Sequence, residues 1–471
     1  MTRSTPLWTA TEIARRIRAR EISALEVVNL HLARIERLNP ALNAIVTLDV
    51  AAAVVRAREA DAALDRGEIW GPLHGVPYTL KDHHPTAGVR TSLGLRGSER
   101  VPDRDGIVSE RLRAAGAILL GKTNMALSVQ TNSELFGRTS NPYDLGRGVG
   151  RSSGGAAAAV ASGMSAFDVG SDASGSIRLP AHFCGVFGLK TTLHRLPLVE
   201  LGLDAPGTPR ADRLLGVYGP IARSAEDLEL VMRALVGTHP EDPECPPVPF
   251  ARVTAVDPGA LRIAAFPTLE GVPNQREQHD ALERTARALR DAGARVETPA
   301  LPVPFAELLS ASRRYYPILM DGLAEAGFSP PAALPDLGSP SLGSLRAVLG
   351  ERDRLAARFE RFFEHYDAIL CPTAIRTAFP HSPPRAPVDV DGVSVPSLYV
   401  DHPCLLSNYL GLPALTLPVA LDSLGLPIGA QLVGARWRDA ELIGVATALS
   451  RICGPIPPPV LRLGPGPQPT T

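Results

Sequence analysis

The chain has 471 residues, of which 45% are hydrophobic and 21% are charged, as in a globular protein with a large core. Its 48 basic and 49 acidic residues nearly cancel, so the charge gives no reason to expect a nucleic acid or an anionic membrane as partner. No run of about 18 apolar residues occurs, which argues against a membrane span.

Five cysteines are scattered through the chain, and none has the C-x-x-C spacing of a metal site or a redox motif. Their positions are Cys184, Cys245, Cys371, Cys404 and Cys453. The N-terminal segment turns amphipathic at once and lacks the apolar centre of a secretory signal. We therefore expect reduced thiols in a cytoplasmic protein.

The first part of the chain alternates between helix and strand patterns, which favours an α/β fold. A helix is expected after Ser23, because Ser23 and Glu26 have the spacing of a capping box. The next elements expected are strand 43–48, helix 51–64, strand 75–81, helix 105–115 and strand 117–121. Lys81 stands at the end of the apolar strand 75–81.

The centre of the chain holds two clusters rich in Gly and Ser, separated by an alanine-rich segment. The alanines of 156–161 favour a helix that begins next to Ser152 and Ser153. A short buried strand is expected at 167–170, and the second cluster, 173–176, follows it. Glycines of this density let a substrate come close to main-chain N–H groups.

The second half of the chain continues the same alternation. A helix is expected over 224–236, and residues 261–297 have the pattern of a β-α-β unit. Two long helices are predicted at 305–326 and 342–363, and the Pro/Gly-rich tail 455–471 is expected to be poorly ordered. The sequence therefore predicts an α/β fold with a large central sheet, mostly parallel or mixed, covered by α-helices on both faces.

The second Gly/Ser cluster has the composition of a nucleophile loop. We expect Ser176 to attack a carbonyl carbon. The N–H groups of Ala173, Ser174, Gly175 and Ser176 are expected to hold the oxyanion. A serine hydroxyl needs a base, yet no histidine lies close in sequence and no G-x-S-x-G elbow is present. Lys81 is the best candidate, because burial at a strand end lowers the pKa of a lysine.

The same residues also have structural interpretations. Lys81 taken alone would be a surface lysine, and Ser152 and Ser153 would cap the alanine-rich helix. Asp172 and Arg178 are better explained as an ion pair or a loop brace than as catalytic groups.

His83 and His84 follow Lys81 directly and raise the question of a metal site. Neighbouring side chains on an extended strand point to opposite faces, so we expect that the two cannot easily act together. No metal-binding spacing accompanies them, and the Gly-rich run lacks the Gly-Lys-Ser/Thr ending of a phosphate-binding loop. We expect neither a metal nor an organic cofactor.

Two central segments, GRSSGGAAAAVASG at 150–163 and GSDASGSIRLPAHFCGVFGLK at 170–190, resemble the amidase signature enzymes. Three later blocks match the same family, namely DAILCPT, NYLGLPALTLP and LPIGAQLVG. The resemblance implies the fold of that family in one domain over 1–454. Its core motifs would lie at about 71–195 and 367–434.

The family's catalytic set is a Ser–cis-Ser–Lys triad. By motif position, the resemblance implies that Ser176 is the nucleophile, Ser152 the cis-serine that relays the proton, and neutral Lys81 the general base. Ser153 and Ser171 would support this network through hydrogen bonds. The family motifs do not cover about 270–345, where we expect substrate specificity to be set.

The chain departs from the family pattern at two positions. Arg151 and Ser174 stand where the family usually has glycine. Arg151 would either crowd the loop or place its guanidinium at the pocket edge, where it would favour an acidic substrate. The resemblance offers Ser128, Val129 and Arg151 as candidate substrate-binding residues.

The predicted function is that of an amidase, which hydrolyses the C–N bond of a linear carboxamide through an acyl-enzyme on Ser176. The partner would be a small-molecule amide, and the resemblance leaves a homodimer open. One alternative is the glutaminase-type subunit of a tRNA-dependent amidotransferase, although its glutamine-binding residues find no match in the second half. Others are a non-catalytic binding protein on the same fold, and an esterase.

Overall fold

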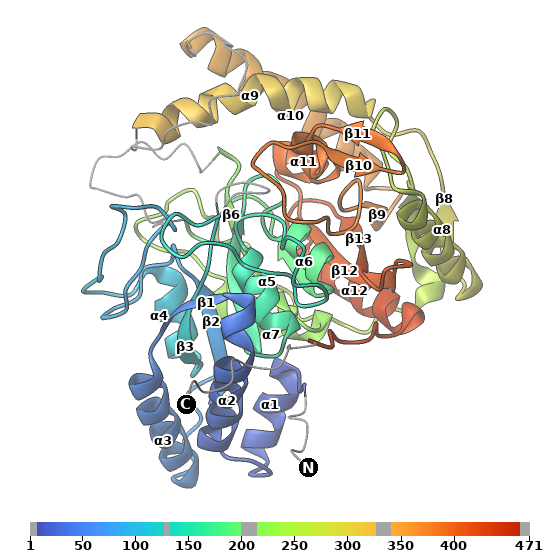
Figure 1. The fold of residues 1–471 in the computed structure, drawn as a ribbon. Helices are drawn as coiled ribbons and strands as arrows, with labels where there is room; N and C mark the ends of the chain where they lie inside the picture. Colours follow the sequence, from blue (N-terminus) through green and yellow to red (C-terminus); the bar gives the residue numbers. More distant parts are fainter. Residues whose placement is uncertain (1–6, 127–131, 199–213, 326–340, 462–471) are drawn as a thin grey trace.

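The computed structural model describes residues 7–126, 132–198, 214–325 and 341–461 (Figure 1). A large sheet of eight strands runs through its centre. In order across the sheet the strands are β4 (Phe167–Asp172), β6 (Val217–Ala222), β5 (Phe187–Lys190), β12 (Ala414–Leu421), β13 (Pro427–Val433), β9 (Ala368–Pro372), β7 (Arg262–Ala265) and β8 (Arg295–Glu297).

The sheet is mixed, which confirms the predicted fold class, and most of its described pairings are antiparallel. From β4 to β9 each strand runs antiparallel to its neighbour. The parallel pairings lie at the edge formed by β9, β7 and β8. The β-α-β unit predicted at 261–297 provides two of these strands, since a parallel pair needs a crossover helix between them.

Helices cover both faces of this sheet, as predicted. On one face α5 and α6 contact each other, and α6 packs on β5, β12 and β13. On the other, α12 packs on β12 and contacts both α7 and α8. The described helices are α1 (Ala10–Arg18), α2 (Ala24–Leu42), α3 (Val50–Asp65), α4 (Ile107–Ala114), α5 (Gly154–Ala161), α6 (Arg178–Cys184), α7 (Ala225–Leu235), α8 (Arg276–Asp291), α9 (Phe305–Glu325), α10 (Leu342–Phe362), α11 (His402–Leu410) and α12 (Asp439–Cys453).

A second, three-stranded sheet brings Lys81 to the centre of the molecule. It consists of β1 (Ile45–Leu48), β3 (Ile118–Thr123) and β2 (Pro77–Lys81), in the order β1-β3-β2. Every residue of β2 is buried. The strand lies beside β4 of the large sheet, where Thr79 donates to the Asp168 carboxylate at 2.7 Å. The two sheets therefore meet at the end of β2 that carries Lys81.

Local signals in the sequence place several helix ends correctly. The capping box of Ser23 and Glu26 is present at the start of α2. Ser224 caps α7 by accepting from the N–H of Asp227. Each such cap is worth about 1 kcal/mol, because it satisfies backbone donors that the helix itself cannot.

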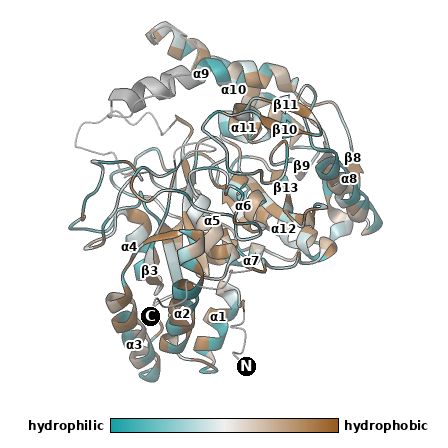
Figure 2. Cartoon of the chain, in the orientation of Figure 1, coloured by the Kyte–Doolittle hydropathy of each residue, from teal (hydrophilic) through white to brown (hydrophobic). Residues whose placement is uncertain are grey.

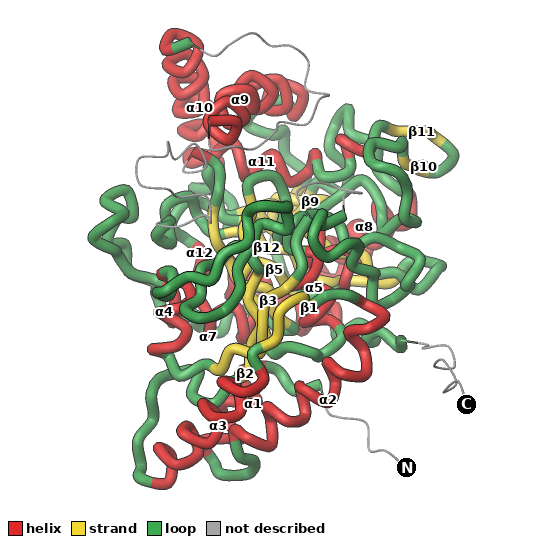
Figure 3. Tube along the Cα trace, turned by 60° about the vertical axis from the view of Figure 1, so that its left-hand side comes forward, coloured by secondary structure: helices red, strands yellow, loops and turns green. Residues whose placement is uncertain are grey.

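Hydrophobic residues collect in the central strands and in α5 and α6, and hydrophilic residues line the outer side of α8 (Figure 2). At one end of the molecule α9 and α10 lie side by side, and α2 and α3 form the opposite end (Figure 3). A short hairpin of β10 (Val388–Val390) and β11 (Val393–Val395) lies outside both sheets.

Among the described residues, no helix is long and apolar enough to cross a bilayer. All five cysteines are unpaired in the structure, and four of them are buried.

Candidate active site

Lys81 is the hub of a hydrogen-bonded cluster at the junction of the two sheets. Its ammonium donates to the hydroxyls of three serines, which are Ser152 at 2.6 Å, Ser171 at 2.9 Å and Ser153 at 3.1 Å. The side chain is almost completely buried, with an exposed fraction of 1%. The structure therefore brings together four residues that the sequence had singled out from distant motifs.

Burial sets the protonation of this lysine. It lowers the pKa of Lys81 from 10.5 to about 7, although the carboxylates of Asp172 and Asp168 act in the opposite direction. A lysine with a pKa near neutral pH spends an appreciable fraction of time as the free amine. Such an amine is able to accept a proton from a neighbouring hydroxyl.

Asp168 is a member of this cluster that the sequence interpretation missed. Its carboxylate accepts from the Lys81 backbone N–H at 3.1 Å and from the hydroxyls of Thr79 and Thr123. Burial raises the pKa of Asp168 to about 7, against these hydrogen bonds. The available signal was an acidic residue inside the apolar strand 167–170, since a buried carboxyl needs partners.

The loop before α5 holds Ser152 against the nucleophile loop. Gly150 has φ +92°, a left-handed conformation that favours glycine. The N–H of Ser153 donates to the carbonyl of Ser176 at 3.2 Å, which ties the two loops together. Ser152 and Ser176 remain 8% and 9% exposed, so both border accessible space.

Two details of the serine pair bear on the expected relay through Ser152. The described peptide bonds are all trans, including the one before Ser152. Within the described residues no hydrogen bond joins the hydroxyls of Ser152 and Ser176. Catalytic hydrogen bonds often tighten only when substrate is bound.

The predicted oxyanion donors require one correction. Gly175 donates its N–H to Asp172 Oδ1 at 2.7 Å, so this amide already has a strong acceptor. The remaining candidates are the N–H groups of Ala173, Ser174 and Ser176. Two features favour glycine at position 175. Its φ is +93°, and an added Cβ would lie only 3.0 Å from the sulfur of Cys404.

Asp172 and Arg178 form the predicted ion pair, with Arg178 Nε 3.0 Å from Asp172 Oδ2 and both side chains fully buried. Burial opposes the ionised carboxylate, but Arg178 and Asn408 hold the pKa of Asp172 well below its usual range. Arg178 also donates to Ser407, Asn408 and Gln431. The pair therefore anchors the nucleophile loop to α11 and β13.

The prediction for His83 and His84 was wrong in its geometry. Strand β2 ends at Lys81, and the N–H of His84 donates to the Lys81 carbonyl in a turn. Because of this turn the two rings lie together, with centroids 4.0 Å apart. Burial lowers both pKa values well below the usual range, so the rings are neutral.

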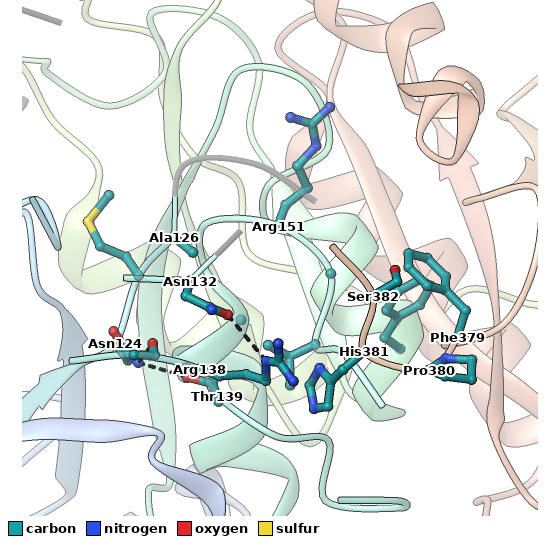
Figure 4. A pocket seen from close by; sticks show the side chains of 18 residues that line it. Asn124, Ala126, Asn132, Arg138, Thr139, Arg151, Phe379, Pro380, His381 and Ser382 are labelled. Atoms are coloured by element: carbon teal, nitrogen blue, oxygen red, sulfur yellow. Dashed lines mark hydrogen bonds between the residues drawn. The ribbon is translucent and has the colours of Figure 1, made fainter. Parts of the chain in front are cut away.

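A small cavity of about 50 Å³ adjoins the loop before Ser152 (Figure 4). Its labelled lining residues are Asn124, Ala126, Asn132, Arg138, Thr139, Arg151, Phe379, Pro380, His381 and Ser382. Figure 4 shows the Arg151 guanidinium pointing away from the others. Arg151 lines this cavity, as in the predicted placement at the pocket edge, and its Nε donates to Asp401 at 2.6 Å. Whether it favours an acidic substrate stays a prediction. Ser128 and Val129 lie outside the described residues.

The described part of the chain contains no group of three or more His, Cys, Asp or Glu side chains able to hold a metal ion. The chemistry of the cluster is that of an amine next to hydroxyls: it can take a proton from a serine and return it.

Comparisons with a family model and with curated proteins point to the same family. The family model described as "Amidase" matches residues 26–324 and 343–443. A glutamyl-tRNA(Gln) amidotransferase subunit of Moorella thermoacetica is 36% identical, over 94% of this chain and 96% of that protein. The corresponding protein of Prochlorococcus marinus is 34% identical, over 93% of this chain and 96% of that protein.

Solved structures of amide-cleaving enzymes have the same fold. A fatty acid amide hydrolase superposes with a TM-score of 0.82 at 25% identity, covering 95% of this chain and 85% of that one. The peptide amidase of Stenotrophomonas maltophilia superposes with a TM-score of 0.78 at 25% identity, and the match covers 97% of this chain and 100% of that one. The family model extends over most of the length, and the curated relatives exceed 30% identity along nearly the whole chain. The chain therefore belongs to the amidase family.

Proposed function

We propose that this protein cleaves the C–N bond of a carboxamide through an acyl-enzyme on Ser176. The observation that carries the proposal is the contact of 2.6 Å between Lys81 Nζ and Ser152 Oγ, made by a lysine whose pKa burial lowers to about 7. A buried amine of this kind is a competent general base near neutral pH.

The proposed reaction has two halves. In the first, Ser176 Oγ attacks the carboxamide carbon, its proton passes to Ser152, and the Ser152 proton passes to neutral Lys81. The N–H groups of Ala173, Ser174 and Ser176 stabilise the oxyanion. The C–N bond then breaks, and the amine leaves with the proton returned through Ser152.

In the second half, water attacks the acyl-enzyme ester. Its proton follows the same route to Lys81, and the carboxylic acid leaves as Ser176 regains its proton. Hydrolysis therefore consumes one water and restores the enzyme without a metal or an organic cofactor. Ser153 and Ser171 hold the Lys81 amine in place through their hydroxyls.

A second candidate uses the same chemistry inside a complex. The curated relatives are named as subunits of a glutamyl-tRNA(Gln) amidotransferase, and these names favour that alternative over a free-standing amidase. In that function the carboxamide would be glutamine, and the ammonia would pass to partner chains. The solved structures named as amide hydrolases favour the free-standing enzyme. Glutamine as substrate separates the two functions.

The rate is expected to rise with pH through neutrality. The base must be unprotonated, so kcat/KM should reach half its plateau near pH 7, the pKa to which burial lowers Lys81. At two pH units below that midpoint about one hundredth of the plateau should remain. Hydrolysis of a neutral primary amide, followed as ammonia release between pH 5 and 9, measures this profile.

The variant Asp168→Asn provides a second test of the pH profile of kcat/KM. The Asp168 carboxylate raises the pKa of Lys81, so its removal should move the midpoint to lower pH. A profile with its midpoint above pH 9, as for an ordinary exposed lysine, would contradict the assignment of Lys81 as base.

A further inference from the structure

Arg151 and Asp401 form a buried ion pair between parts of the chain that lie 250 positions apart. Arg151 Nε donates to Asp401 Oδ2 at 2.6 Å, and the side chains are only 9% and 3% exposed. Arg151 belongs to the loop that carries Ser152, and Asp401 directly precedes α11. The pair therefore joins these two segments at the site.

The pair lies beside the proposed nucleophile. Arg151 stands next to Ser152 in the chain, and the following residue, Ser153, is hydrogen-bonded to the Ser176 carbonyl. From the other side, a Cβ on Gly175 would lie 3.5 Å from the Cβ of Asp401. The ion pair and the nucleophile loop therefore pack close together at Asp401 and Gly175.

Each buried carboxylate of this region already has a partner from the chain. Asp401 is paired with Arg151 and Asp172 with Arg178, and Asp168 accepts from the Lys81 N–H and from two threonines. Losing water without gaining a carboxylate is costly for an ammonium group. A substrate with an ammonium near its carbonyl would therefore have to displace an internal partner.

Of the described carboxylates, Asp172 also acts on Asp401 through its charge, and it is already paired with Arg178. His402, the next residue along the chain, is kept neutral because burial, with Arg313 and Arg151 nearby, lowers its pKa to about 4. The ring of His402 lies 4.4 Å from that of Tyr399, and Arg313 of α9 approaches the Tyr399 ring. Arg313 belongs to the region 270–345, where the sequence predicted specificity to be set.

We propose that the Arg151–Asp401 pair is a specificity determinant, which closes the site to ammonium-bearing amides and selects carboxamides with uncharged acyl groups. The inference rests on the proposed amide cleavage by Ser176 and narrows its substrate class. Without Arg151 the Asp401 carboxylate would lose its internal cation, and a substrate ammonium could take that place.

The test compares butanamide with 4-aminobutanamide and with glutamine as substrates of the full chain. We expect wild type to prefer butanamide by at least tenfold in kcat/KM over both ammonium-bearing amides. The variant Arg151→Met should reduce this preference by about tenfold or more. The double variant Arg151→Met/Asp401→Asn should restore it, because no carboxylate remains to hold the ammonium.

Arg147→Met is the matched control, since it breaks an Arg–Asp pair on the same loop, with Asp144, and should leave the preference unchanged. Labelling of Ser176 by a fluorophosphonate is measured in parallel on every variant. Wild type that is labelled but cleaves glutamine or 4-aminobutanamide as well as butanamide would overturn the inference alone. So would an unchanged preference in labelled Arg151→Met. Unlabelled wild type would overturn the proposed function and the inference with it.

Discussion

Replacing Lys81 with methionine is expected to lower kcat/KM for a carboxamide by about two to four orders of magnitude, the usual contribution of a positioned general acid–base group. Methionine preserves the length and burial of the side chain but accepts no proton. It also removes the hydrogen bonds to Ser152, Ser153 and Ser171. Steady-state hydrolysis of a neutral amide, with the midpoint of thermal unfolding measured alongside, provides the comparison.

Lys122 offers a matched control for this variant. It is also a fully buried lysine, on the neighbouring strand β3, and burial lowers its pKa to about 8. Its ammonium donates to the His84 carbonyl and to Thr91 rather than to the serine cluster. Lys122→Met should therefore affect stability more than chemistry. Equal losses of kcat/KM in the two folded variants would mean that Lys81 acts only through packing.

Arg178→Met is expected to destabilise the protein by roughly 3–5 kcal/mol, because it leaves the Asp172 carboxylate buried without its cation. The same substitution removes the donors to Ser407, Asn408 and Gln431. The free energy of unfolding from urea denaturation measures the effect. In the double variant Arg178→Met/Asp172→Asn part of the loss should be recovered, since no charge is then left unpaired.

An exposed pair provides the contrast. Arg295 and Glu297 form a salt bridge on the surface, with side chains 67% and 39% exposed. Arg295→Met should leave the free energy of unfolding almost unchanged, as is usual for solvated ion pairs. If Arg178→Met cost no more than this, the buried pair would not be the anchor of the nucleophile loop.

Much of the site could be predicted because its residues lie in dense local motifs. The Gly/Ser clusters and the apolar strand before Lys81 indicated which residues to bring together, and the cluster of Lys81, Ser152, Ser153 and Ser171 is present. The helix starts at Ser23 and Ser224 could also be predicted from the sequence, since a cap depends on residues only three positions apart.

The features that could not be predicted depend on contacts between residues that lie far apart in the sequence, or on turns that no sequence motif indicates. Pairing of β5 with β12 joins residues near 189 and 415, and nothing in either strand shows that the pair is antiparallel. The Arg151–Asp401 contact likewise spans 250 positions. The turn that brings the rings of His83 and His84 together was missed because both residues were treated as extended backbone. Long-range packing, rather than propensity, decided each of these features.

The most direct test of the account is the intact mass of the protein after reaction with a fluorophosphonate. We expect one adduct on wild type, none on Ser176→Ala, and an unchanged adduct on Ser174→Ala, which keeps the backbone N–H of the same loop. This pattern would identify Ser176 as an activated nucleophile. Either of two results would contradict the central claim. A folded wild type without an adduct would favour a binding protein on an amidase fold, and an adduct that persists in Ser176→Ala would mean that another residue is the reactive nucleophile.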